Sequence, residues 1–419
     1  MQPAAREPAA DTGLLVDHLF RHQHAPILGA LVRMLGSAHL ALAEECVQDA
    51  FLRALQNWPF HGIPPNPAAW LTLVAKRRAL DHLRRAAPAT PATEPTARPA
   101  QEPTLGDDTL ELIFLCCHPA LPADSQLALT LRSVAGLSTS EIARAFLAPE
   151  PTIAQRIVRA KRLIETSNLA FDVPFDAHLA PRLHAVCRVL YLMFNEGYSA
   201  SSGDRLLRED LCHEAIRLVT LLTRNPATGR PAVHALAALF CLQAARLPAR
   251  TDDAGDLLTL ESQNRALWNP RLTAAGFHHL VHAAAGDVVT PWHLEAEIAS
   301  LHAHAPTFAD TDWPRLASAY EALSALQPSP VVTLAQAVAI SYAESPQAAL
   351  ALLAPLANEP TLARYHLYPA ILADLHARCG NTTAARTNLE RALALAPTTP
   401  ERHHLARRLA SLPSVRRSA

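Results

Sequence analysis

A proline-rich segment near residue 90 constrains the fold of this chain more than any other feature of its sequence. From Ala86 to Gly106 the chain reads AAPATPATEPTARPAQEPTLG, with no apolar residues at helical spacing. Such a segment cannot bury enough apolar surface to become ordered, and its prolines keep it extended. The sequence therefore predicts a linker at residues 87–106, which separates a compact domain at residues 11–86 from a second at residues 107–168.

Outside this linker the chain is predicted to be all-α. Half of the residues are apolar, only 5 % are aromatic, and Ala and Leu dominate. Ala and Leu are the apolar residues that favour helix most, and no β-rich stretch is visible. Residues 169–419 are expected to form a large helical domain. Within it, residues 330–397 have small and large apolar residues placed as in tetratricopeptide-like helix pairs, at 333–355 and at 370–397.

The first domain is predicted to contain three or four helices. One ends at Gly36, and its apolar positions are Leu28, Leu31, Val32 and Leu35. A second runs from about Ala38 to Trp58, with one stripe formed by Val47, Phe51, Leu55 and Trp58. Residues 59–67, PFHGIPPNP, are predicted to be a loop, and a third helix begins near Ala68.

The third helix combines a tryptophan with a basic cluster, Lys76, Arg77 and Arg78, one to two turns after Trp70. This combination suits melted DNA, whose bases stack on aromatic rings and whose phosphates need neutralising. The alternative is that Trp70 belongs to the core and that the basic residues only solvate the helix end. The pattern alone slightly favours this alternative, because the basic residues do not share one face.

The strongest pattern in the second domain is an amphipathic basic helix at residues 151–166. Its apolar stripe consists of Ile153, Ile157, Ala160 and Ile164, and its opposite face carries Thr152, Gln155, Arg156, Arg159 and Arg162. Arg and Gln side chains pair with base edges in the major groove. A shorter helix precedes it, with a capping box from Ser138 to Glu141 and with Ile142 and Phe146 directed inward. Together the two predict a helix-turn-helix, the alternative being an ordinary solvated basic helix.

Several segments resemble bacterial sigma factors. Residues 40–55, LALAEECVQDAFLRAL, resemble the helix of sigma region two that binds core RNA polymerase, and residues 66–85, NPAAWLTLVAKRRALDHLRR, resemble the promoter-melting helix. The helix-turn-helix, with its AQRIVRAKRLI run, resembles sigma region four. Their order and spacing are similar to the extracytoplasmic-function group. FLCCHPAL, ARAFLAPEPTIAQR, YLMFNEGYSA and DLCHEAIRL resemble a subgroup of it that carries a tetratricopeptide-like C-terminal extension.

The resemblance implies a transcription initiation factor with RNA polymerase core and promoter DNA as partners. The residues that it places against the polymerase are Glu44, Glu45, Gln48, Asp49 and Phe51. Those placed at the −10 element are Asn66, Trp70, Lys76, Arg77 and Arg78, with residues 58–67 as the wall of the pocket for a flipped base. Those placed at the −35 element are Thr152, Gln155, Arg156, Arg159 and Arg162. This −10 pocket has fewer aromatic residues than that of primary sigma factors.

No other pattern indicates a catalytic site, a cofactor or a metal. Cys116, Cys117 and His118 lack the further ligands that zinc requires. Asn195 to Tyr198 is expected to lie in a turn that serves as a subgroup-specific interface, and the acidic loop at residues 252–256 does not fit an EF-hand. The net charge of −1 means that evidence for DNA binding must come from local clusters.

The chain is expected to be cytoplasmic. Its seven cysteines form no regular framework, which is typical of reduced thiols. The first ten residues show no secretory signal, and no run approaches the roughly 18 apolar residues that a membrane span needs. We expect the C-terminal extension to regulate the factor, either by contact with its own sigma domains or by binding a partner protein.

Two other functions fit parts of the sequence. One is a helix-turn-helix regulator that acts without core polymerase, for which Asp49 and Phe51 would be dispensable. The other is an enzyme in the C-terminal extension, which would require a deep polar pocket near Glu196 and Asp204. The sigma-factor interpretation assigns no catalytic residue to the chain.

Overall fold

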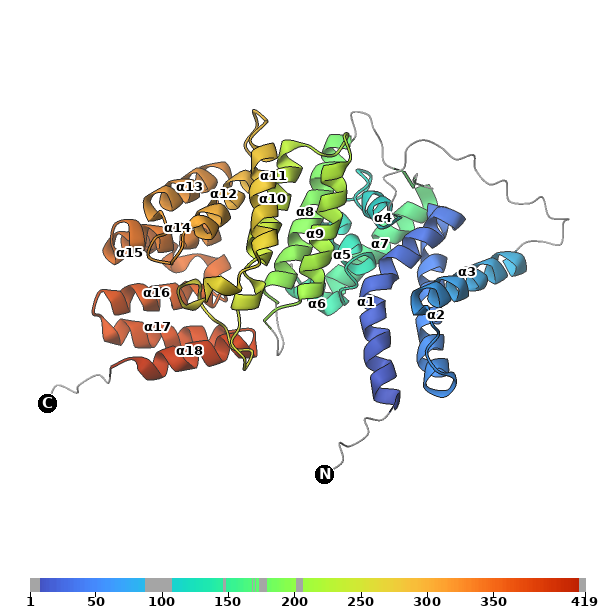
Figure 1. The fold of residues 1–419 in the computed structure, drawn as a ribbon, viewed down its shortest axis with the longest axis horizontal. Coiled ribbons are helices and arrows are strands. Elements are labelled where there is room, and N and C mark those ends of the chain that lie inside the picture. The colour runs from blue at the N-terminus through green and yellow to red at the C-terminus, as the bar shows by residue number, and fades with distance from the viewer. Residues whose placement is uncertain are drawn as a thin grey trace, which may run out of the picture. The chain divides into compact units, whose positions relative to one another are not determined.

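The computed structural model of the chain describes residues 8–86, 108–145, 148–167, 169, 171–172, 179–200 and 206–413. Within these ranges the regular structure is helical, as the sequence predicts (Figure 1). The chain divides into two compact units, residues 1–193 and 194–419. The predicted linker at 87–106 and the side chain of Phe146 lie outside the described residues.

The first unit begins with three helices that match the predicted first domain. Their bounds, with one short 3₁₀ helix, are α1 Pro8–Leu35, η1 Ser37–His39, α2 Leu40–His61 and α3 Pro67–Ala86. Leu28, Leu31 and Val32 are fully buried. Gly36, with φ 88°, ends α1 in a conformation that favours glycine.

Two details of α2 differ from the prediction. The helix continues through Pro59 to His61 and ends at Gly62, whose φ is 81° and whose N–H donates to the Trp58 carbonyl. A proline so near the end removes only one hydrogen bond of the last turn, so the loop is confined to residues 62–66. Leu55, predicted to face inward, is 43 % exposed.

The rest of the first unit contains the predicted helix-turn-helix. Its helices are α4 Asp108–Cys116, α5 Ala123–Ser133, α6 Thr139–Ala145 and α7 Glu150–Ser167, and most of α8 Leu179–Tyr198 also belongs to it. The predicted capping box is present at the start of α6. The Ser138 N–H donates to Glu141 at 2.7 Å, and the Glu141 N–H donates to the Ser138 hydroxyl at 3.2 Å.

The two sequence-predicted sigma domains pack against each other within this unit. Helix α4 is buried against α1 and α5. Arg33 of α1 pairs with Glu111 and, at 2.5 Å, with Asp108. Gly29 of α1 lies so close to the Asp108 carbonyl that a Cβ atom there would be 2.5 Å from its oxygen.

The second unit is built of helices that pack on their neighbours along the chain, and Figure 1 shows α12 to α18 stacked in order. The α-helices are α9 Glu209–Arg224, α10 Pro231–Ala244, α11 Pro270–Ala283, α12 Pro291–His304, α13 Trp313–Leu326, α14 Pro330–Ala343, α15 Pro346–Leu353, α16 Leu367–Arg378, α17 Thr382–Leu395 and α18 Thr399–Ser411. The 3₁₀ helices are η2 Leu247–Ala249, η3 Leu260–Ser262, η4 Arg265–Leu267, η5 Ala354–Asn358 and η6 Pro360–Leu362.

Helix α10 is the central helix of the second unit. The stretch Pro231–Ala249 is long and apolar enough to cross a membrane, so the expectation that no such run exists is wrong. However, 78 % of its most apolar window is buried inside the protein. The high apolarity therefore reflects a helix packed on nearly all sides, by α9, α11 and α12.

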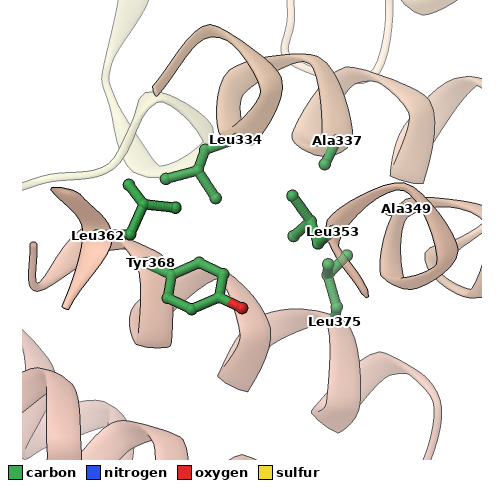
Figure 2. Close-up of a cluster of buried hydrophobic side chains, with 7 residues drawn as sticks. All are labelled: Leu334, Ala337, Ala349, Leu353, Leu362, Tyr368 and Leu375. Atoms are coloured by element: carbon green, nitrogen blue, oxygen red, sulfur yellow. The ribbon is translucent and has the colours of Figure 1, made fainter. Parts of the chain in front are cut away.

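The helix pairs expected near the C-terminus are present. Residues 333–355 fall in α14 and α15, and residues 370–397 fall in α16 and α17, joined through Gly380 at φ 78°. Figure 2 shows the core between α14, α15 and α16, which contains Leu334, Leu353, Tyr368 and Leu375. Small residues such as Ala337 and Ala349 allow these helices to approach closely.

Candidate nucleic-acid and polymerase interface

Helix α7 has one buried face and one polar face. The predicted apolar stripe is buried in full, with Ile153 and Ile164 completely inaccessible and Ile157 and Ala160 nearly so. This stripe packs on α5 and α6. On the opposite face Gln155, Arg159 and Arg162 are exposed, and Thr152 and Arg156 are partly exposed. The helix therefore presents guanidinium and amide groups outward from a fixed base.

The sequence analysis did not single out two features of this face. Arg156 is not free, because its guanidinium lies 3.1 Å from the Asp124 carboxylate of α5. Val158 is 64 % exposed among the polar residues. An exposed aliphatic side chain between Arg and Gln is suited to contact with a thymine methyl group. The position of Val158 outside the predicted apolar stripe could have indicated that its side chain is exposed.

The start of α3 is fixed by Asn66, whose side-chain oxygen accepts the Ala69 N–H at 3.0 Å. Asn66 thus has a helix-capping role beside the DNA contact predicted for it. Trp70 is partly exposed and meets the buried Trp58 edge to face, with ring centroids 5.4 Å apart. Phe60, which the sequence analysis did not single out, is 83 % exposed in the last turn of α2. It adds an aromatic surface next to the loop at residues 62–66.

The basic cluster on α3 is spread around the helix, in agreement with the sequence. Arg77 is exposed, Lys76 is half-buried, and Arg78 turns toward α2. The Arg78 guanidinium lies 3.2 Å from the Asp49 carboxylate, which also pairs with Arg53 at 3.2 Å. Asp49, predicted to contact the polymerase, therefore holds α2 to α3.

The five residues predicted to bind the polymerase do not share one surface. Glu45 and Gln48 are exposed on α2, whereas Phe51 is buried and packs edge to face on Phe20 of α1 at 5.1 Å. The ring of Phe51 fills the core and is not exposed in this structure, so its contact with the polymerase stays a prediction. The exposed face of α2 instead continues from Glu45 and Gln48 to Leu52 and Leu55, which are 55 % and 43 % exposed.

Glu44 lies at the contact of the two sigma domains rather than on the outer surface. Its carboxylate accepts a hydrogen bond from the Ser133 hydroxyl at 3.0 Å and forms an ion pair with Lys161 of α7. The Ala41 N–H nearby donates to Glu165 of α7 at 3.0 Å. These contacts join the helix assigned to polymerase binding with the helix assigned to the −35 element.

The cysteines offer no reactive thiol or metal site at this interface. Cys116 and Cys117 are buried, and burial raises the pKa of Cys117 to about 12, so the thiol stays protonated near neutral pH. Among the described residues no group of three or more His, Cys, Asp and Glu side chains is arranged to hold a metal ion.

Comparison with known proteins finds three family models along the chain. Family models match in order: Sigma-70 region 2 at residues 19–88, Sigma-70 region 4 at 111–164, and a family of unknown function, DUF6596, at 182–284. The RNA polymerase sigma-H factor of Pseudomonas aeruginosa is 31 % identical over 164 residues, which cover 35 % of this chain and 82 % of that protein. The chain belongs to the extracytoplasmic-function group of RNA polymerase sigma factors.

This sigma factor directs RNA polymerase core to promoters through regions 2 and 4. The protein families defined by these two regions are not enzyme families. An uncharacterized protein of Rhizobium meliloti is 41 % identical over 401 residues, 91 % of this chain and 92 % of that protein. The match therefore includes the long extension. No solved structure matches the chain.

Within the extension, the motif from Asn195 to Tyr198 was expected to lie in a turn, but it forms the end of α8, and two of its residues have structural explanations. Gly197 of α8 lies against the start of α9, where a Cβ atom would be 2.8 Å from the Arg208 carbonyl oxygen and from the Cys212 N. The next residue, Tyr198, has the guanidinium of Arg250 over its ring, 3.7 Å from the centroid. Both residues thus serve packing inside the second unit. Glu196 lines neither of the two cavities described in this unit, and Asp204 lies outside the described residues.

Proposed function

We propose that the sigma factor reads the −35 element with the exposed face of α7. The observation that carries this proposal is the separation of α7 into a buried apolar stripe and an outward face with Gln155, Arg159 and Arg162. Arg pairs with guanine and Gln with adenine in the major groove, and a preceding capped helix is the partner that such a reader requires. Thr152 and Arg156 flank this face, and we add Val158 to it.

We further propose that the −10 element is melted and held by the end of α2, the loop at 62–66 and the start of α3. Trp70, Phe60 and Asn66 would contact unstacked bases, and Lys76, Arg77 and Arg78 would neutralise phosphates. The support is that Phe60 is exposed in the last turn of α2 and that Trp70 is partly exposed near the start of α3.

For polymerase docking we propose the α2 stripe of Glu45, Gln48, Leu52 and Leu55. Exposed leucines bordered by polar residues are typical of protein interfaces. Asp49 would support this stripe through its ion pair with Arg78. Glu44 would join the surface only if the contact between the two sigma domains opens.

We propose that the extension regulates initiation, either by contact with the sigma domains or through a partner protein, and that it has no catalytic activity. We also propose that the protein is cytoplasmic and does not enter the membrane. The support is that its cysteines are free and that its most apolar helix is buried in a core.

Transcription in vitro tests the docking surface. Full-length protein is added to sigma-free core polymerase on genomic fragments, and the start sites of the products are sequenced. We expect discrete start sites, lost with Leu52→Glu, because a buried unpaired carboxylate in the docking interface is strongly unfavourable. Leu267→Glu is the matched control, since Leu267 is 52 % exposed in the second unit.

The controls separate the alternatives. Start sites that survive Leu52→Glu would refute the proposed α2 surface. Promoter DNA binding in the absence of core, unchanged by Leu52→Glu, would support a regulator that acts without polymerase.

A further inference from the structure

The second unit contains a cavity that no function has yet explained. It has a volume of about 700 Å³ and is lined by α12, α13, α14, α16 and α18 together with residues 257–262. Small-molecule sites in proteins commonly have volumes of about 300–1,000 Å³. Leu334 and Leu375 belong both to the cavity wall and to the buried cluster of Figure 2. One side of the cavity is therefore backed by a packed core.

The segment that precedes residues 257–262 is fixed to α18. The Asp256 carboxylate accepts a hydrogen bond from Arg407 at 2.8 Å, and its other oxygen lies 2.9 Å from His403 Nδ1. Asp252 shapes the turn by accepting the N–H groups of Ala254 and Asp256. The acidic loop thus uses its carboxylates to hold Leu257 and Leu260 in the cavity wall.

Aromatic side chains form a second side of the cavity. Trp313 and Tyr342 stack with centroids 4.4 Å apart, and Phe308 meets Trp313 edge to face at 4.9 Å. Tyr320 and Tyr365 also line the space. Such walls favour an apolar or aromatic body, and the tyrosine hydroxyls add polar contacts.

The charged groups of the cavity make it negative. Its carboxylates are Glu261, Asp374 and Glu401. Asp374 is engaged by two guanidiniums, that of Arg408 at 2.6 Å and that of Arg378 at 3.8 Å, and Arg378 also lies over the ring of Tyr342 in the cavity wall. Three carboxylates and two guanidiniums leave one negative charge, and Glu401 already accepts a hydrogen bond from the Thr398 hydroxyl at 2.7 Å.

Two histidines of the wall stay neutral near pH 7. Burial, with Arg246 and Arg265 nearby, lowers the pKa of His302 to about 3. Burial, with Arg408 and Arg407 nearby, also lowers the pKa of His404. Among the described residues Glu261 has no ion-pair partner and is exposed, so its carboxylate is available to a ligand.

We infer that this cavity binds a small organic cation, a molecule with an apolar or aromatic body and a protonated amine that meets Glu261. The apolar walls accept the body, and the unpaired carboxylate of Glu261 attracts the amine and repels an anion of the same shape. The inference rests on the cavity alone, so its test is independent of the roles proposed for α2, α3 and α7.

Three probes of one shape test the inference on the full-length protein: 4-phenylbutylamine, 4-phenylbutanol and 4-phenylbutyrate. Binding is measured by titration calorimetry and by ligand-observed NMR at pH 7. We expect the amine to bind at least about tenfold more tightly than the butyrate, with the alcohol between them. Glu261→Gln should weaken amine binding about fivefold or more and leave alcohol binding unchanged.

Two further variants complete the test. Ala335→Trp, which fills the cavity, should abolish binding of the amine and the alcohol. Glu321→Gln, an exposed carboxylate on α13 outside the cavity wall, should change nothing. The inference is overturned if no probe binds the wild-type protein at millimolar concentration, if the butyrate binds as well as the amine, or if Glu261→Gln and Glu321→Gln have equal effects.

Discussion

At the scale of single residues, Gly197 shows why one position of the extension requires glycine. A Cβ atom there would meet backbone atoms of Arg208 and Cys212 at 2.8 Å, and backbone cannot move aside cheaply. We expect Gly197→Ala to lower the free energy of unfolding by roughly 1–3 kcal/mol in urea titrations. Gly13→Ala is the control, because a Cβ atom at Gly13 meets nothing within 4 Å. It should be neutral or stabilising by up to about 1 kcal/mol, and an equal loss in both variants would refute the packing argument.

Glu44 has one role predicted from the sequence, polymerase binding, and a different role in the structure, the contact between the two sigma domains. The sequence assigns it to the polymerase, yet its carboxylate is buried between Ser133 and Lys161. We expect Glu44→Gln to destabilise the first unit by roughly 1–3 kcal/mol, since it leaves the half-buried Lys161 ammonium without its counter-charge. Glu45→Gln, one residue further and exposed, should change stability by less than about 0.5 kcal/mol. Chemical unfolding followed by circular dichroism measures both, and equal values would contradict the structural role of Glu44.

At the scale of elements, α7 uses different residues for folding and for the proposed contact with DNA. Ile157→Ala removes a buried side chain and should cost roughly 2–5 kcal/mol of stability. Arg159→Ala and Arg162→Ala remove exposed groups and should leave stability unchanged within about 0.5 kcal/mol. In holoenzyme they should weaken promoter recognition by about 1–3 kcal/mol for each base contact that is lost.

Run-off transcription on promoters with altered −35 sequences distinguishes base contacts from phosphate contacts. Losing a base contact relaxes the sequence preference at one promoter position. Losing a phosphate contact weakens binding to every promoter, and it reduces the slope of the logarithm of the binding constant against the logarithm of the salt concentration by about 0.9. Arg271→Ala, at an exposed arginine of the extension, is the control. Full activity of both α7 variants on every promoter would refute the proposed reading face.

At the scale of the whole molecule, buried histidines should make the protein sensitive to acid. Burial lowers the pKa of His24 to about 4 in the first unit, and the pKa values of His279 and His302 in the second to about 4 and about 3. Below about pH 6.5 the unfolded chain binds protons that the folded protein does not. Stability should therefore fall as the pH drops from about 6.5 to about 4.

Urea titrations at pH 7.5 and pH 5 measure this loss. His24→Gln should reduce it for the first unit, because the amide does not titrate. His22→Gln, at an exposed position on the same helix, should not change it. A stability that is constant between these pH values would contradict the burial of neutral histidines.

Local sequence determined much of the fold and of the face proposed to read DNA. The apolar positions of α7 repeat every three to four residues, so the helix must bury Ile153, Ile157, Ala160 and Ile164 whatever it packs against. The capping box at Ser138 and Glu141 needs only four consecutive residues. The helix pair at 370–397 follows from its own periodicity and from Gly380.

The tertiary structure alone decided which polar residues remain free. Glu44 looks like a surface residue in the sequence, and it is buried because Lys161, 117 residues away, lies against it. Asp49 is engaged by Arg78, and Leu55 is 43 % exposed although its place in the apolar stripe of α2 predicts that it faces inward. The negative cavity likewise brings together Glu261, Asp374 and Glu401 from distant segments. Periodicity reports which face of a helix is apolar, because that depends on neighbours in the same helix. It does not report what covers a polar side chain, because that depends on chain segments whose positions only the packed fold sets.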